Sequence, residues 1–247
     1  MADGFVAVRA AFPAEVAASC CDVVWQKLAA RGIYPHDRAT WRSPVVRIPC
    51  PEGGPFVDAG TATALWEAYD QLIGAGRWGR RHGVGGSIPV RFPIEGDPGD
   101  AGWHIDTSFP VDGDLWANVR TRDRGLLALF LFTDVTESDA PTRVLVGSHL
   151  DVARVLEPAG ERGLTIRGVL AELEPQTFER NVALATGAAG DVYLCHPFVV
   201  HAASWPHRGD RPRMLAQPGV FLKEPYRLTD VAGAPPVERA ILRALGR

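Results

Sequence analysis

The chain has 247 residues, of which 46% are hydrophobic and 22% are charged, an ordinary composition for a globular protein of one large or two small domains. Its formal net charge is −3 and no run of like charges is longer than the pair Arg80–Arg81, which argues against binding to nucleic acid or to an anionic membrane surface. Four cysteines without a C-x-x-C motif, no secretory leader and no long apolar run predict a cytoplasmic protein without a disulfide framework, a zinc–thiolate site or a membrane span.

Two amphipathic helices are predicted in the first third of the chain. Residues 13–32 have Pro13 near the start and Gly32 just past the end, the positions that proline and glycine favour around a helix. The apolar residues between them recur at helical spacing: Val16, Cys20, Val23, Val24 and Leu28. The stretch TATALWEAYDQLIGAG predicts a second helix, from Thr61 to about Gly74. We therefore expect residues 1–84 to form a helical support.

Short apolar runs separated by glycine, proline and aspartate replace this pattern from about residue 85. They are SIPVRFP, GWHIDTSF, GLLALFLFTDV, TRVLVG, NVALAT, GDVYLCH, FVVHAA and MLAQPGVFL. Many short strands with turn residues between them are typical of a β-sandwich or barrel. Ser148, with Asp151 three residues later, predicts a capped helix start, and PVERAILRAL predicts a C-terminal helix. Because no repeat or linker divides the chain, we expect one domain, with a β core over residues 85–225 and the last helix within 226–247.

The segment GWHIDTSF places His104 and Asp106 two positions apart. In a strand, residues i and i+2 point to the same face, so this imidazole and carboxylate would form half of a metal site. By itself H-x-D is more typical of a hydrogen-bonded pair, and the prediction depends on a third ligand. His196 and His201 differ by an odd number of positions, so only one of them would face the interior on a continuous strand. We favour His201, because it falls within the strand-like run PFVVHAA, where a histidine needs a partner.

Two histidines and one carboxylate form the facial triad of non-heme Fe(II) oxygenases, which leaves positions open for other ligands. Zinc is the alternative metal, but it gives no reason for the arginines of the segment DRPRML. An arginine that enters a barrel beside a metal needs an anionic partner, and a dicarboxylate co-substrate would supply one. Arg213 fits this position, whereas Arg211 fits a solvated loop better.

With these residues in place, the chain resembles the phytanoyl-CoA dioxygenase-like (PhyH) family of Fe(II)/2-oxoglutarate-dependent oxygenases. The resemblance rests on WHID, GSH and GDVYLCHPFVVHAASWPHRGDRPR and runs from about residue 85 to 222. It implies a double-stranded β-helix (jelly roll, cupin-like) with flanking helices. It also implies that Fe(II) binds to His104, Asp106 and His201. Arg213 would hold the 2-oxoglutarate carboxylate, and O2 would be the oxidant.

The chain departs from the family pattern in two places. Ala203 stands where the family often has serine, and the loop that carries Trp205 is one residue longer. Asp106 is retained, whereas relatives that halogenate have a small residue at that position. The resemblance therefore implies hydroxylation, or a related oxidation, of a small-molecule metabolite with release of succinate and CO2.

Two other functions stay open at this point. A cupin-type metal-dependent isomerase or hydrolase would use the same three ligands and would be indifferent to Arg213. A jelly-roll binding protein would lack catalysis, although intact His104, Asp106 and His201 argue against a vestigial site.

The segment GAGRWG matches the G-x-G-x-x-G pattern of dinucleotide sites. It follows a predicted helix rather than a strand, so no nucleotide site is expected. Residues 74–87 are instead predicted to form a mobile, arginine-bearing segment near the mouth of the barrel, with Arg77, Arg80 and Arg81.

Overall fold

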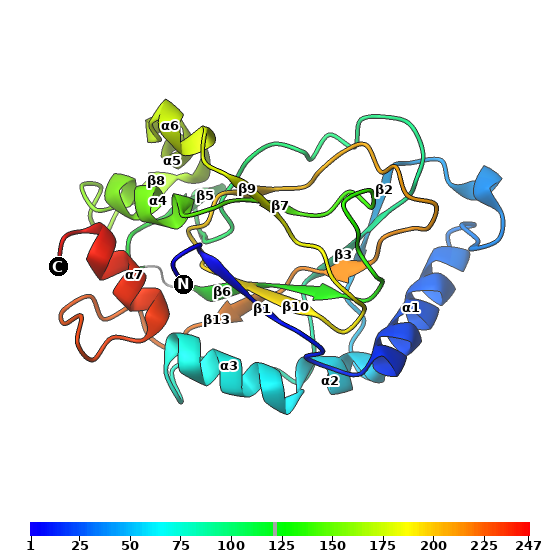
Figure 1. Ribbon diagram of the computed structural model, residues 1–247, viewed down its shortest axis with the longest axis horizontal. Coiled ribbons are helices and arrows are strands. Elements are labelled where there is room, and N and C mark those ends of the chain that lie inside the picture. Colours follow the sequence, from blue (N-terminus) through cyan, green and yellow to red (C-terminus); the bar gives the residue numbers. More distant parts are fainter. Residues whose placement is uncertain (121–122) are drawn as a thin grey trace.

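β6 (Arg124–Leu131) is the longest described strand and lies at the centre of the main sheet (Figure 1). The computed structural model of the chain describes residues 1–120 and 123–247. Every residue of β6 after Arg124 is buried, because apolar side chains cover both faces of the strand. The sheet consists of β1 (Phe5–Val8), β10 (Val192–Cys195), β6, β12 (Leu215–Ala216) and β13 (Gly219–Phe221), all paired antiparallel.

Three smaller antiparallel sheets complete the described β-structure. They are β2 (Val45–Pro49) with β3 (Ser87–Arg91); β7 (Arg143–Leu145) with β9 (Val182–Leu184) and β11 (His201–Ala202); and β4 (Phe109–Val111) with β5 (Asp114–Ala117) and β8 (Leu164–Thr165). Leu127, Leu129 and Leu131 of β6 share an apolar cluster with Val144 of β7, so this face of the main sheet packs against the second sheet. The architecture is the jelly roll that the resemblance implied.

Helices cover the other face of the main sheet, where Leu126, Ala128 and Phe130 share a second cluster with helical residues. In chain order the helices are α1 (Ala14–Ala29), the 3-10 helix η1 (Arg38–Thr40), α2 (Pro55–Gly60), α3 (Thr63–Ile73), α4 (Ser148–Leu156), α5 (Ile166–Glu172), α6 (Pro175–Phe178) and α7 (Pro236–Ala244). The helices α4 to α7 gather at one end of the molecule (Figure 1). None of the helices in the described ranges is long and apolar enough to cross a membrane.

The structure confirms the predicted helices α1, α3 and α7 within a few residues of their ends. The helical description of residues 1–84 was incomplete, because this region also contributes β1 and β2. β1 is a short edge strand whose partner β10 comes from the far end of the chain, so no local pattern marks it. The capping role predicted for Ser148 is wrong: Gly147 is the N-cap, and the Ser148 hydroxyl accepts a hydrogen bond from the Val200 N–H at 2.8 Å. The proposed domain limits stay a prediction.

The segment GWHIDTSF is not the continuous strand that its alternation predicted. Only His104 forms an isolated β-bridge, to His201, and regular pairing begins at Phe109. The side chain of Arg143 holds the backbone that precedes His104, as described below, so the position of this histidine depends on a tertiary contact.

Residues 74–87 make specific contacts with the helices, and the mobility predicted for this segment stays a prediction. Arg77 pairs with the buried carboxylate of Glu238 at 2.5 Å. Trp78 is buried, and its indole N–H donates to the Asp70 carboxylate at 2.7 Å. Arg81 donates to the carbonyl of Val84 at 2.6 Å. The first two contacts tie residues 77–78 to α7 and α3, while Ser87 at the other end accepts a hydrogen bond from the N–H of Gln217, a residue beside the cavity at His104.

Candidate active site

His104 and His201 lie side by side although they are far apart in the sequence. Their backbones exchange two N–H···O hydrogen bonds of 2.9 Å each, and the centroids of their rings are 4.4 Å apart. Residues directly opposite each other on antiparallel segments project to the same side. The fold therefore brings together the two histidines that the sequence pattern selected.

A backbone carbonyl fixes one ring nitrogen of each histidine. Nδ1 of His104 lies 2.9 Å from the carbonyl oxygen of Gly102, and Nδ1 of His201 lies 3.1 Å from that of Val199. When Nδ1 donates its proton to a carbonyl, Nε2 carries the lone pair and the ring orientation is set. Burial, reinforced by His104, lowers the pKa of His201 to about 4, so this ring is neutral at physiological pH. Neutral imidazole is the form that binds metals.

Asp106 lies beside this pair, but its carboxylate is engaged elsewhere. Oδ2 of Asp106 forms an ion pair with the guanidinium of Arg124. Its charge still acts on His201, whose pKa it raises against the larger effect of burial. Within residues 1–120 and 123–247, no three His, Cys, Asp or Glu side chains are arranged to hold a metal ion. The structure therefore assembles two of the three predicted ligands and leaves the third adjacent and paired with Arg124.

His196, the alternative to His201, lies in the core next to α4 and α7. Its ring centroid is 4.9 Å from that of His149. Nδ1 of His196 accepts a hydrogen bond from the Phe198 N–H at 3.1 Å, and Nε2 lies 3.3 Å from the carbonyl oxygen of Val237. Because the main chain occupies both ring nitrogens, His196 is a structural histidine.

Arg213 is 1% exposed and lies directly opposite Arg91 in an isolated β-bridge. Its Nη1 donates to the carbonyl oxygen of Ala140 at 2.6 Å, while its buried Nε has no hydrogen-bond partner. Burial and the charge of Arg91 lower the pKa of Arg213 to about 9. Arg211, in contrast, is exposed. A buried guanidinium whose donors are not all satisfied is costly, so this position suits an anionic ligand.

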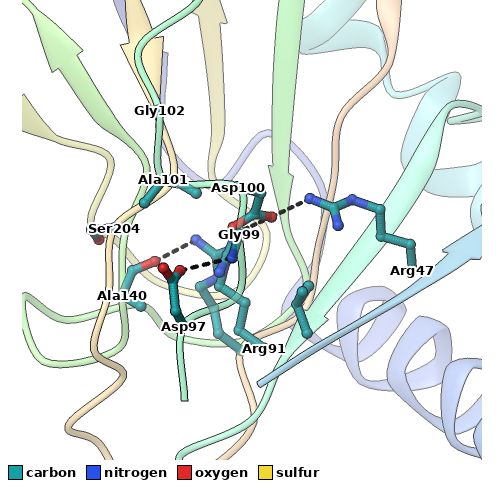
Figure 2. Close-up of polar contacts among 12 residues, drawn as sticks. Arg47, Arg91, Asp97, Gly99, Asp100, Ala101, Gly102, Ala140 and Ser204 are labelled. Carbon is teal, nitrogen blue, oxygen red and sulfur yellow. Dashed lines mark hydrogen bonds and ion pairs between the residues drawn. The ribbon is translucent and has the colours of Figure 1, made fainter. Parts of the chain in front are cut away.

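Asp100 stands between two further arginines (Figure 2). Nη2 of Arg91 donates to both carboxylate oxygens of Asp100, at 2.7 and 2.6 Å, and Arg47 contacts one of them. Burial alone would raise the pKa of Asp100, but the two guanidiniums outweigh it and lower the pKa. Sequence reasoning missed all three residues. The one available signal was Arg91 inside the otherwise apolar run SIPVRFP, because arginine is rare in a buried strand.

A cavity of about 410 Å³ lies beside the two histidines, a volume suited to a small molecule. Its lining consists of Arg47, Pro89, Arg91, Gly99, Asp100, Gly102, Trp103, His104, His201, Ala203 and Gln217. A second cavity of about 490 Å³ lies between α4 and α7, but its lining has no histidine, cysteine or carboxylate. The predicted ligands His104 and His201 therefore belong to the first cavity.

Arg143 of β7 connects the two segments that carry the histidines. Its Nη2 donates to the carbonyl of Ala101 at 2.9 Å, and its Nε donates to that of Ala203 at 3.3 Å. Its guanidinium also stacks on the Trp103 ring, 4.6 Å from the centroid. Ala101 precedes His104 and Ala203 follows His201, so this one side chain binds the backbone of both segments that carry the histidines. No local pattern marks Arg143, because all of these contacts are long-range.

Residues 80–215 match the phytanoyl-CoA dioxygenase (PhyH) family. This match covers more than half of the chain, and the protein belongs to the PhyH family. No curated protein matches the chain.

Solved structures with related folds agree with this assignment. The epimerase SnoN in complex with Fe3+, alpha-ketoglutarate and nogalamycin RO is 16% identical, covers 90% of this chain and 79% of its own, and superposes with a TM-score of 0.59. The alpha-ketoglutarate-dependent carbocyclase SnoK is 20% identical, with coverages of 90% and 80% and a TM-score of 0.57. HygX from Streptomyces hygroscopicus, with nickel and 2-oxoglutarate bound, is 14% identical, with coverages of 90% and 84% and a TM-score of 0.51. At these identities, the likeness establishes the jelly-roll fold.

Proposed function

We propose that this protein is an Fe(II)- and 2-oxoglutarate-dependent oxygenase that oxidises a small-molecule metabolite, most simply by hydroxylation, with release of succinate and CO2. One observation carries the proposal. Carbonyl oxygens hold Nδ1 of His104 and of His201, which leaves their Nε2 atoms for a ligand, and the buried guanidinium of Arg213, whose Nε has no partner, lies opposite Arg91 of the same cavity. A metal ion would satisfy the two Nε2 atoms, and a dicarboxylate would satisfy the guanidinium of Arg213.

The donor set fits iron with one adjustment. His104 and His201 would supply two nitrogen ligands and Asp106 the carboxylate, the donor types of the facial triad. Arg124 contacts Oδ2 of Asp106, which leaves Oδ1 to turn toward the imidazoles. When bound, the iron together with 2-oxoglutarate would supply the activation of O2.

The chain's own residues would orient the reactants and exclude water. Arg213 would hold the far carboxylate of 2-oxoglutarate through a charge-assisted, two-pronged contact. The backbone carbonyls of Gly102 and Val199 fix the histidine rings, so little reorganisation is needed when metal binds. SnoN and HygX are solved with alpha-ketoglutarate or 2-oxoglutarate and a metal bound, which supports the same co-substrate for this chain.

Two features bear on the type of oxidation and on its setting. The neighbours include an epimerase and a carbocyclase, so the fold accommodates outcomes other than hydroxylation. The retained Asp106 favours hydroxylation over halogenation. All four cysteines are free thiols, which supports the proposal of a reducing, cytoplasmic setting.

A substrate-library screen tests the proposal, with succinate release measured in the presence of Fe(II), ascorbate and 2-oxoglutarate. We expect substrate-stimulated succinate formation that is lost in His201→Ala and kept in His82→Ala, a histidine outside the cavity. Metal-dependent turnover without 2-oxoglutarate would favour the isomerase or hydrolase alternative. Ligand binding without any turnover would favour the non-catalytic alternative.

A further inference from the structure

Three arginines share one face of β2, β3 and the segment that precedes β12 in the candidate active site. Arg47 lies two residues after Val45, which is directly opposite Arg91 in the β2–β3 pair. Arg91 is in turn directly opposite Arg213 across an isolated bridge. Because alternate residues of a strand and directly opposed residues of a pair share a face, Arg47, Arg91 and Arg213 project to the same side.

The fixed negative charge on this face does not balance the positive charge. Of the residues that line the cavity within the described ranges, Arg47 and Arg91 are cationic and Asp100 is the single carboxylate. Asp100 serves both arginines, with two oxygen contacts to Arg91 and one to Arg47. If 2-oxoglutarate occupies Arg213 and Asp100 neutralises Arg91, the charge of Arg47 is left uncompensated.

Arg47 is placed where an incoming molecule would meet it. Its side chain is 51% exposed, whereas those of Arg91 and Asp100 are 3% and 17% exposed, so Arg47 stands at the open side of the group. Of its three guanidinium nitrogens, Nη2 makes the contact to Asp100. The remaining N–H groups of the fork match the two oxygens of a planar carboxylate or of a phosphate.

The rest of the cavity lining suits the body of a small organic molecule. Trp103 offers an aromatic wall that is held in place by Arg143 on its ring. Pro89 adds an apolar surface, and Gln217 adds an amide that can donate or accept a hydrogen bond. These walls are predominantly neutral, so Arg47 is the group best placed to select a substrate by charge.

We propose that the substrate of this enzyme is an anionic small molecule whose carboxylate or phosphate group binds to Arg47, with the body of the molecule against Trp103. This inference rests on the proposed function, because it assigns Arg213 to 2-oxoglutarate. Asp100 then acts as an internal competitor, since it holds Arg47 until the substrate anion arrives.

The test measures binding to the full-length protein loaded with Mn(II) and 2-oxoglutarate, a complex that does not turn over. Phenylacetate, benzyl phosphate and phenylacetamide share an aromatic skeleton and differ in charge, and their dissociation constants are measured by calorimetry. We expect at least one of the two anions to bind about tenfold or more tightly than the amide. The anion that binds more tightly distinguishes a carboxylate from a phosphate substrate.

Variants of opposite expected sign separate a binding role from a structural one. Arg47→Gln should remove most of the advantage of the anion, a loss of about 10- to 100-fold in affinity. Asp100→Asn should strengthen anion binding several-fold, because it removes the competitor of the substrate. Arg42→Gln, which changes an exposed arginine outside the cavity, is the matched control and should leave affinities within about twofold of wild type.

Three outcomes would overturn the inference. They are equal affinity for the amide and both anions, no binding of either anion, and an unchanged anion affinity in Arg47→Gln. The proposed function would survive each of them if 2-oxoglutarate still binds. Failure of the wild-type metal complex to bind 2-oxoglutarate would overturn both proposals together. The titration of 2-oxoglutarate therefore accompanies every variant.

Discussion

Replacing Arg213 by leucine should change ligand-free stability and co-substrate affinity in opposite directions. The guanidinium is buried with one donor unsatisfied, and its pKa of about 9 reflects the cost of holding the charge beside Arg91 in the interior. Because this pKa is below the ordinary arginine value but above neutrality, Arg213 is charged at pH 7 in both the folded and the unfolded state. The folded protein therefore bears the full cost of burying the charge at that pH.

The size of both effects follows from these contacts. Replacing buried charged groups by apolar side chains is often neutral or stabilises a protein by up to about 4 kcal/mol. Loss of the hydrogen bond to the carbonyl of Ala140 offsets about 1 kcal/mol of this gain. We expect the free energy of unfolding of ligand-free Arg213→Leu to exceed that of wild type by up to roughly 3 kcal/mol. The affinity for 2-oxoglutarate should fall by about 3 kcal/mol, roughly a hundredfold, because its carboxylate loses its partner.

Urea unfolding gives the stability of each protein, and anaerobic titration through the Fe(II)–2-oxoglutarate absorption band gives the affinity. Arg213→Lys keeps the charge without the planar fork and should show an intermediate affinity. Arg211→Leu is the control, because Arg211 is exposed and belongs to the same segment. The reasoning is refuted if Arg213→Leu binds 2-oxoglutarate like wild type. A marked loss of stability would instead show that the charge of Arg213 is better compensated than its contacts indicate.

Three further predictions concern the metal ligands, the Arg143 contacts and pH. His201→Ala should abolish Fe(II) binding in anaerobic calorimetry while His196→Ala retains it; the reverse result would show that His196 is the ligand. Arg143→Leu should weaken Fe(II) affinity about tenfold, because both carbonyl contacts beside the histidines are lost. Arg143→Lys should restore part of this affinity. Unchanged affinity in Arg143→Leu would show that Arg143 does not position the histidines. Burial lowers the pKa of His149 to about 4, an effect that neighbouring Arg180 reinforces and Asp151 opposes. Below about pH 6.5 the unfolded state therefore takes up a proton that the folded state does not. His149→Gln should therefore remove about 2 kcal/mol of the stability that wild type loses between pH 7 and pH 5, measured by urea unfolding; an unchanged pH dependence would contradict this cause.

The sequence was sufficient for the features that depend on short-range pattern. Apolar residues at helical spacing marked α1, α3 and α7 because a helix buries one face, whatever it packs against. Short apolar runs separated by turn residues marked the β core, because a strand also buries one face whatever it packs against. The odd separation of His196 and His201 predicted that one of them would leave the site, and the structure places His196 against α7. The roles of His104, Asp106, His201 and Arg213 as ligands stay predictions.

Only the tertiary structure decided which charges meet. Asp100 faces Arg47 and Arg91, and Asp106 faces Arg124, through contacts between segments with no common pattern. At residues 102–109 the expected strand is reduced to one bridge, from His104 to His201, and Arg143, from a strand far along the chain, contacts the backbone before His104. The spacing of apolar residues along a helix or strand predicts the face on which a side chain lies, and this spacing is visible in the neighbouring sequence. The partner on the opposite face is determined by how distant segments pack, because an ion pair gains its energy from proximity in space and leaves no periodic trace in either segment.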